Sequence, residues 1–380
     1  MLKEKINIIE KIEFIDLQSQ RRVLGDKIPK AIENVLDHGG YIFGPQVGLL
    51  EQKLSAYTQA QDTVTCSNGT DALKLLLLAY NIGPGDAVFV PTFTFASTAE
   101  VVASVNATPV FIDVCPYTFN MDPKSLEKAI ASLDKNLTPK GIIAVDLFGL
   151  PADYDVLHDI ANQHQLWVIS DAAQSFGGAI GEKRVGNLTN VTTTSFFPSK
   201  PLACYGDGGA IFCNDKELST TLRSLRNHGC GVHRYDHIHI GLNSRLDTIQ
   251  AAILLEKLEI FPQELKRRQE IANFYTNALR EVVQVPLTPS GKTHAWGLYT
   301  IVVHDERDVL MNALQEANVP CNIYYRKPLH LQPAYQHFPR ATEHLKNAEN
   351  ACGKVLSLPM HPYLSDEQLD YICNIVKHNF

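Results

Sequence analysis

The run SFFPSKPLACYGDGGA, from Ser195 to Ala210, carries the strongest indication of the fold. Lys200 lies in this run between Pro198 and Pro201. Because proline breaks the interior of a helix, the lysine is expected on a loop or at a strand end, held by its neighbours. A lysine held in this way can form a Schiff base with an aldehyde. It can equally be an ordinary surface lysine, so the residues that accompany it must decide between the two interpretations.

An acidic residue closes an apolar run upstream, in LWVISDAAQS from Leu166 to Ser175. Asp171 follows the strand-like residues, and a carboxylate in this position can keep the nitrogen of a bound heterocyclic ring protonated. Gln174, three residues further on, can hydrogen-bond to a ring hydroxyl. The aspartate can instead cap a short helix over residues 172–174, and the run alone leaves both alternatives open.

Length, charge and cysteine content narrow the class of protein. The 380 residues suit one large domain with a smaller one. The net charge of −7 is spread without a basic stripe, which disfavours nucleic-acid binding, and no apolar run is long enough to cross a membrane. Residues 1–17 lack the apolar core of a secretory signal. The eight cysteines show no C-x-x-C spacing, so no metal site is expected and a reduced, cytoplasmic protein is favoured.

Short β-rich runs alternate with helical runs through the first two-thirds of the chain. Strands are expected at residues 87–90, 110–114, 142–145, 167–170, 191–196 and 210–213. Helices are expected at residues 71–80, 98–104, 123–132 and 154–163. This alternation predicts an α/β domain around a mainly parallel sheet, whose ligand lies beyond the carboxyl ends of the strands.

The pattern changes near residue 255. The later part of the chain indicates a long charged helix, a strand, a helix and a final helix, at residues 264–280, 298–303, 307–317 and 366–378. We therefore expect a large domain over residues 14–255 and a smaller C-terminal α/β domain over residues 256–380.

The sequence SNGTD, from Ser67 to Asp71, precedes an apolar helical run. Gly69 allows backbone to approach a ligand closely, the helix start offers free N–H groups, and Thr70 adds a hydroxyl, so the turn can hold a phosphate. An ordinary helix cap by Thr70 or Asp71 explains the same residues.

Two further segments contain candidate ligand contacts. In PTFTFAST, from Pro91 to Thr98, one aromatic ring can stack on a planar ligand, and Phe93 is assigned to the core. Asn243 and Arg245 stand just before an amphipathic helix, where the amide can reach a phosphate. Arg245 can pair with a substrate carboxylate or form a structural ion pair.

These motifs, in this order, resemble the DegT/DnrJ/EryC1/StrS family of sugar aminotransferases, which has the type I fold of pyridoxal-phosphate-dependent transferases seen in aspartate aminotransferase. The resemblance runs from about residue 14 to the C-terminus and is carried by SNGTDAL, DAAQSFG, SFFPSKPLACYGDGGA and NSRLDTIQAA. It implies that Lys200 bonds to the aldehyde of pyridoxal 5′-phosphate, Asp171 pairs with the ring nitrogen and Gln174 contacts the ring oxygen, while Phe95 stacks on the ring. The residues implied to hold the phosphate are Gly69, Thr70, Ser195 and, from the other subunit of a homodimer with shared active sites, Asn243.

The resemblance also implies a substrate. The motifs are most similar to those of enzymes that aminate C3 of nucleotide-linked 3-keto sugars, with UDP-2-acetamido-2-deoxy-3-oxo-glucuronate as the expected acceptor, glutamate as the donor and surface polysaccharide (O-antigen) synthesis as the purpose. The implied substrate contacts are Arg245, Tyr324, Tyr325 and Arg326. The last three replace the H-Y-P that such enzymes usually carry, so a different 3-keto or 4-keto sugar on UDP or dTDP remains an alternative.

Two other functions stay open within the same resemblance. Sugar dehydratases of the family carry histidine where this chain has Lys200, which argues against that activity. A non-catalytic sensor of cofactor or sugar is the other alternative, although no DNA-binding extension precedes the expected domain.

Overall fold

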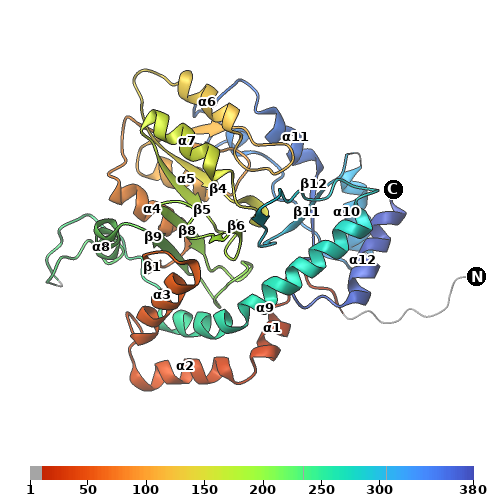
Figure 1. Cartoon of the computed structure of the whole chain (residues 1–380), viewed down its shortest axis with the longest axis horizontal. Helices are drawn as coiled ribbons and strands as arrows, with labels where there is room; N and C mark the ends of the chain where they lie inside the picture. Colours follow the sequence, from red (N-terminus) through yellow and green to blue (C-terminus); the bar gives the residue numbers. More distant parts are fainter. Residues whose placement is uncertain (1–10, 234, 305) are drawn as a thin grey trace, which may run out of the picture.

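A mixed, mainly parallel sheet forms the centre of the computed structural model, which describes residues 11–233, 235–304 and 306–380 (Figure 1). The first ten residues of the charged lead-in therefore lie outside the described residues. Within the described ranges the central sheet has seven strands, in the spatial order β1 (Asp62–Cys66), β9 (Gly209–Cys213), β8 (Val191–Ser195), β5 (Trp167–Asp171), β4 (Thr138–Val145), β2 (Asp86–Pro91) and β3 (Thr108–Ile112). Strands β8, β5, β4, β2 and β3 pair in parallel, whereas β9 runs antiparallel to both β1 and β8. The α/β class expected from the sequence is confirmed.

The strands are buried on both faces, as the apolar runs of a parallel sheet require. On β9, Ile211 and Cys213 join one hydrophobic cluster, while Ala210 and Phe212 join another. Helices cover the two faces accordingly. One cluster receives apolar residues from α4 (Gly69–Ala79), α5 (Ser97–Ser104), α6 (Pro123–Ala131), α7 (Tyr154–His164) and α8 (Lys216–Leu225). The other receives them from α3 (Pro45–Thr58) and the long helix α9 (Thr248–Leu279).

Helix α9 joins the two ends of the molecule, running from below the central sheet to the C-terminal elements (Figure 1). It begins well before the charged helix expected over residues 264–280 and continues through Pro262. A proline normally ends a helix, but the buried Phe261 and Ile271 on either side pack into separate cores and hold the helical backbone in place. The domain boundary expected at residue 255 falls within this helix and stays a prediction.

The C-terminal part has its own core around the end of α9. It contains the two-stranded sheet of β11 (Tyr299–Val302) and β12 (Val355–Leu358), with α10 (Arg307–Glu316) and α12 (Asp366–His378) packed on it. Ser365 and Gln368 form a capping box that fixes the start of α12. A further apolar cluster, including Phe93 and Phe148 from the large part and Leu298 and Val355 from the C-terminal part, joins the two.

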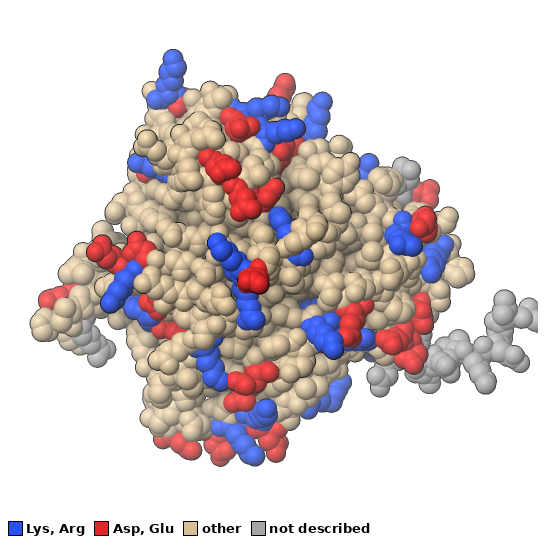
Figure 2. All heavy atoms as spheres, viewed as in Figure 1, with Lys and Arg blue, Asp and Glu red and all other residues tan. Residues whose placement is uncertain are grey.

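The remaining elements complete the chain. They are α1 (Leu17–Leu24), α2 (Lys27–His38), α11 (Lys346–Lys354), the short 3-10 turns η1 (Leu147–Gly149) and η2 (Leu329–Leu331), and the small sheet of β6 (Ala179–Ile180), β7 (Lys183–Arg184) and β10 (Lys292–Thr293). Among the described residues, no helix is long and apolar enough to cross a membrane. On the face shown in Figure 2, positive and negative side chains are interspersed.

Candidate active site

The candidate site lies where several strands end at one edge of the sheet. Asp171 closes β5 and Ser195 closes β8, and these strands pair in parallel. Gly209, the first residue of the antiparallel β9, is registered against both Ser195 and Cys66, the last residue of β1. The carboxyl ends of β1, β5 and β8 therefore meet at this edge, as expected for a ligand site of an α/β sheet.

Lys200 and Asp171 form the charged centre of the site. Lys200 lies in the turn after β8, where its backbone N–H donates to Phe197 at 2.9 Å. Burial lowers the pKa of the Lys200 ammonium, and the nearby Asp171 carboxylate opposes that shift. Burial likewise raises the pKa of Asp171, opposed by the backbone N–H of Ala173 and by Lys200. The two side chains that the sequence singled out are thus brought together, 29 positions apart in the numbering of the chain.

One face of the Asp171 carboxylate is weakly occupied. Its Oδ1 accepts a hydrogen bond from the Ala173 N–H at 3.1 Å, while among the described residues its Oδ2 has only a 3.5 Å contact, from the Thr98 hydroxyl. Asp171 is 7% exposed, so this second oxygen has little access to water. A protonated ring nitrogen supplies the kind of donor that such a buried carboxylate oxygen needs.

The start of α4 forms a cradle with the end of β8. A Cβ placed on Gly69 would lie 2.8 Å from the Ser195 Cβ, so only glycine allows the helix start to approach this closely. Asn68 caps the helix by accepting from the Asp71 N–H at 2.8 Å. The turn therefore does cap the helix, but the capping residue is Asn68 and not Thr70 or Asp71, as the sequence suggested. The cap leaves the Gly69 backbone and the Ser195 hydroxyl at the mouth of the helix, where an anion such as phosphate fits.

Hydroxyl groups complete the cradle. The Thr70 Oγ1 lies 2.7 Å from the Ser97 Oγ at the start of α5, and the Ser195 Oγ accepts from the Phe197 N–H at 3.3 Å. Ser97 was not predicted from the sequence as a site residue. It could have been, because this hydroxyl residue lies two positions after Phe95 in the PTFTFAST segment, which already contained a candidate ligand contact.

Gln174 is held by the segment that follows β4. Its Oε1 accepts from the Phe148 N–H at 2.6 Å, and its side chain also hydrogen-bonds to Tyr325. Burial and then the negative charge of Asp171 raise the pKa of Tyr325. Tyr325, expected to contact substrate, therefore lies beside Gln174 and Asp171, with Tyr324 next to it at a ring-centroid distance of 5.8 Å.

The two phenylalanines of the PTFTF segment differ as the sequence indicated. Phe93 is in the core, where its ring meets Tyr325 at a centroid distance of 5.9 Å. Phe95 is 61% exposed just before α5, so its ring is available to stack on a ligand. The stacking of Phe95 on the cofactor ring stays a prediction.

The remaining predicted contacts, Asn243, Arg245 and Arg326, have other partners in the described chain. Asn243 is exposed and is bridged to Asn227, whose side-chain oxygen accepts from Arg245 at 3.3 Å. Arg326 is exposed, and its guanidinium meets the Met311 sulfur at 3.8 Å. Their assignment to substrate or to a second subunit's cofactor stays a prediction. No group of three or more metal-ligating side chains occurs among the residues described.

Comparison with known proteins assigns the family. The sequence profile of the DegT/DnrJ/EryC1/StrS aminotransferase family matches residues 23–377. The UDP-2-acetamido-2-deoxy-3-oxo-D-glucuronate aminotransferase of Pseudomonas aeruginosa is 46% identical over 367 residues, which is 95% of this chain and 98% of that protein. A crystal structure of a DegT DnrJ EryC1 StrS aminotransferase from Brucella abortus is 49% identical, with a TM-score of 0.95 over 97% of this chain and 99% of that one.

A second solved structure bears on the cofactor. NtdA from Bacillus subtilis, crystallised with bound PMP, has a TM-score of 0.89 at 29% identity, over 99% of this chain and 86% of that one. The expected fold, a type I pyridoxal-phosphate-dependent transferase, is confirmed by these structures. The chain belongs to the DegT/DnrJ/EryC1/StrS aminotransferase family.

Proposed function

We propose that this protein is a pyridoxal-phosphate-dependent aminotransferase that moves an amino group from glutamate to C3 of UDP-2-acetamido-2-deoxy-3-oxo-glucuronate. The observation that carries the proposal is the placement of Lys200 beside Asp171, at the sheet edge where Gly69 meets Ser195. The name of the Pseudomonas relative supports the choice of sugar. The amino sugar would serve surface polysaccharide synthesis, and the reaction would take place in the cytoplasm.

Pyridoxal phosphate, when bound, supplies an aldehyde that takes up the amino group and a protonated ring that withdraws electrons from the bond being broken. Lys200 would hold the aldehyde, and its amine, once free, would move a proton between the donor Cα and the cofactor C4′. Because burial lowers the pKa of Lys200, more of its amine is neutral at a given pH, and the neutral form is the one that accepts a proton.

The other residues would fix the cofactor. Asp171 would accept from the ring nitrogen and keep it protonated, Gln174 would contact the ring oxygen, and Phe95 would stack on the ring. The phosphate would lie at the start of α4, held by Gly69 and Thr70 with the Ser195 hydroxyl. Helix N–H groups and the positive end of the helix dipole stabilise an anion in such a position.

A second subunit would complete the site. The chain after α8 projects from the body of the molecule, and Val232 and Ile240 on this projection are 99% and 94% exposed (Figure 1). Exposed apolar side chains on a projecting segment support contact with another copy of the chain. Because the same segment leads into Asn243, this contact would carry the amide to the phosphate of the neighbouring subunit's cofactor. Arg245, Tyr324, Tyr325 and Arg326 are the proposed sugar contacts, and a cation among them would meet the uronate carboxylate.

The experiment has two halves. The enzyme loaded with pyridoxal phosphate is mixed with glutamate, and 2-oxoglutarate is measured together with loss of the cofactor's visible absorption band. A panel of UDP- and dTDP-linked 3-keto and 4-keto sugars is then added, and the sugar that restores the band and yields an amino sugar is the acceptor. We expect the UDP-3-oxo-glucuronate to act best. A dehydratase would release a deoxygenated sugar without nitrogen, and a sensor would give no product.

Two lysine variants make the test specific. Lys200→Ala and Lys200→Arg should bind the phosphate but lose turnover, because neither can bond to the aldehyde. Lys183→Ala, at an exposed lysine of β7, serves as the control and should be as active as the wild type. Wild-type turnover by the Lys200→Ala protein would show that the proposed function is wrong.

A further inference from the structure

A second strand-end carboxylate lies directly behind the site. Asp146 follows β4, the neighbour of β5, and it is fully buried. Its Oδ1 accepts from the Ala152 N–H at 2.8 Å and from the Tyr154 hydroxyl at 2.6 Å, and its Oδ2 accepts from the Ser175 hydroxyl at 2.7 Å. Nothing in the proposed reaction uses this carboxylate, so its hydrogen bonds call for a separate explanation.

These hydrogen bonds tie the segment after β4 to the segment after β5. The Asp146 backbone N–H donates to the Asp171 carbonyl at 3.0 Å. Its side chain then holds Ser175, the residue next to Gln174. Two residues beyond Asp146, the Phe148 N–H donates to the Gln174 Oε1 at 2.6 Å. The separation between Asp171 and Gln174 is thus set by one residue, Asp146, just after the adjacent strand β4.

The anchor is also braced from α7. Tyr154, at the start of that helix, contacts both Asp146 and the Ser170 hydroxyl, the latter at 2.7 Å. Lys292 donates to the Pro151 and Ala152 carbonyls at 3.0 and 2.8 Å, on the same segment that supplies the Ala152 N–H to Asp146. Burial, and to a smaller extent the charge of Asp171, raises the pKa of Asp146 to about 6, against the hydrogen bonds from Tyr154, Ala152 and Ser175.

We propose that Asp146 is a positioning residue for the cofactor ring, tethering the Ser175 segment so that Asp171 and Gln174 meet the ring nitrogen and ring oxygen together. This inference rests on the proposed function. It assigns Asp146 no contact with cofactor or substrate: the carboxylate acts through the backbone and side chains that it holds. A site whose contacts are fixed in advance binds its ligand without the cost of ordering them.

Three variants separate the tether from simple packing. Asp146→Ala removes all three side-chain acceptor contacts. Asp146→Asn keeps an oxygen for the Ala152 and Tyr154 donors, and its amide can donate to the Ser175 hydroxyl, so the tether survives without the charge. Ser175→Ala cuts only the contact that leads to Gln174. The control is Tyr275→Phe, which removes a buried 3.0 Å hydrogen bond to Pro359 in the C-terminal core, away from the site.

The readouts are the dissociation constant of pyridoxal phosphate, from titration of the cofactor-free enzyme, and the pH midpoint of the visible band of the lysine-bound cofactor. Asp146→Ala should weaken binding roughly tenfold, the equivalent of one lost hydrogen-bonded contact. It should also raise the pH midpoint by about one unit, because a ring nitrogen held less firmly is less protonated and withdraws fewer electrons. Ser175→Ala should change both in the same direction by a smaller amount, and Asp146→Asn should stay near the wild type.

The melting temperature distinguishes a positioning role of Asp146 from a merely structural one. Tyr275→Phe should lower the melting temperature but leave cofactor affinity and pH midpoint unchanged. The inference is overturned if Asp146→Ala lowers only the melting temperature, or if Asp146→Asn is as impaired as the alanine variant. If Asp146→Ala does not fold, unchanged affinity and midpoint in Ser175→Ala overturn it. A wild-type enzyme that develops no visible band with pyridoxal phosphate would instead refute the proposed function.

Discussion

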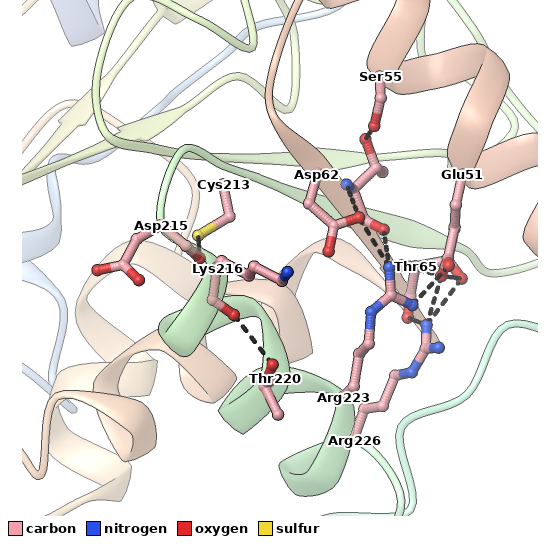
Figure 3. Close-up of polar contacts among 11 residues, drawn as sticks. Glu51, Ser55, Asp62, Thr65, Cys213, Asp215, Lys216, Thr220, Arg223 and Arg226 are labelled. Atoms are coloured by element: carbon pink, nitrogen blue, oxygen red, sulfur yellow. Dashed lines mark hydrogen bonds and ion pairs between the residues drawn. The ribbon is translucent and has the colours of Figure 1, made fainter.

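A buried cluster of ion pairs fastens α3 to the end of α8, and breaking it should cost more stability than any surface pair (Figure 3). The Glu51 side chain, which is 8% exposed, accepts from the Arg226 guanidinium at 2.6 Å and from the Arg223 guanidinium at 2.7 Å. Its Oε1 also accepts from the Thr65 N–H and hydroxyl at 2.9 and 2.8 Å. Arg226, equally buried, also donates to Thr65, and its guanidinium lies 4.9 Å from the centre of the Phe43 ring.

The perturbation is Glu51→Gln, which keeps the shape and one acceptor oxygen but removes the charge. Arg226 then stays buried without a counter-charge, and breaking a buried pair in this way costs about 3–5 kcal/mol of unfolding free energy. Because glutamine still accepts from Thr65, we expect the lower end, about 3 kcal/mol. Arg223 is partly exposed and keeps its ion pair with Asp62 at 2.8 Å, so it should not change the expected loss of stability.

The assay is urea unfolding at pH 7 with a matched control. Glu259→Gln removes an ion pair with Lys53 that is short, 2.5 Å, but solvent-exposed, and it should cost less than about 1 kcal/mol. A double-mutant cycle with Glu51→Gln, Arg226→Met and the double variant measures the interaction free energy between the two side chains. The double variant should lose less than the sum of the single losses, because no lone charge is left buried.

The pH dependence supplies an independent check. Burial alone would raise the pKa of Glu51, but Arg226 and Arg223 hold it below its ordinary value. A carboxyl whose pKa is lowered by folding contributes its stability above the unfolded pKa and loses it as the pH falls through the folded pKa. The difference between wild type and Glu51→Gln should therefore be complete at pH 7 and shrink below about pH 4. Equal losses for Glu51→Gln and Glu259→Gln, or a difference that does not depend on pH, would refute this reasoning.

Two other predictions follow from single positions. Gly69→Ala places a Cβ 2.8 Å from that of Ser195, so titration should show that pyridoxal phosphate binds roughly tenfold more weakly. The control is Gly48→Ala, because Gly48 lies in α3 with open space around it. This control should leave cofactor binding unchanged and stabilise the helix by up to about 1 kcal/mol. Equal cofactor affinity in the two variants would contradict the cradle. Burial lowers the pKa of His294 to about 3, so its stability contribution is complete above the unfolded pKa and is lost as the pH falls, by roughly 2 kcal/mol between pH 6.5 and 4.5. Urea unfolding of His294→Asn should show an unfolding free energy that changes less with pH over that range than in the wild type. An unchanged pH slope would contradict the lowered pKa of His294.

The parts of the fold that the sequence predicts are those set by local patterns. Apolar runs locate β2, β4, β5 and β9, because strands buried on both faces leave continuous apolar segments. Strand β1 was missed because its sequence, DTVTC, is short and half polar, and it becomes a strand through pairing with β9. The antiparallel direction of β9 likewise depends on pairing with partners far away in the chain, which no local pattern encodes.

The site divides in the same way. Proline spacing places Lys200 on a turn and the apolar run places Asp171 at a strand end, so both could be identified before the fold was known. The closeness of Gly69 to Ser195 and of Gln174 to Tyr325 could not, because each pair joins segments more than a hundred residues apart in the chain. The family resemblance implied a role for each of these residues, and the folded chain shows which of them lie close together.

Asp146 shows why a sequence pattern alone does not assign a role. Like Asp171, it closes an apolar run, GIIAV before it and WVIS before the other, and the two acids follow neighbouring parallel strands. The two carboxylates differ in how many hydrogen-bond donors contact their oxygens. Three side-chain and backbone donors occupy both Asp146 oxygens, while Asp171 has one oxygen with a single long contact from the part of the chain that the structure describes, and it lies near Lys200. A carboxylate with its acceptors filled can hold the protein together, and one with an acceptor to spare can hold a ligand, so the division of work between the two acids follows from the hydrogen bonds that folding gives each of them.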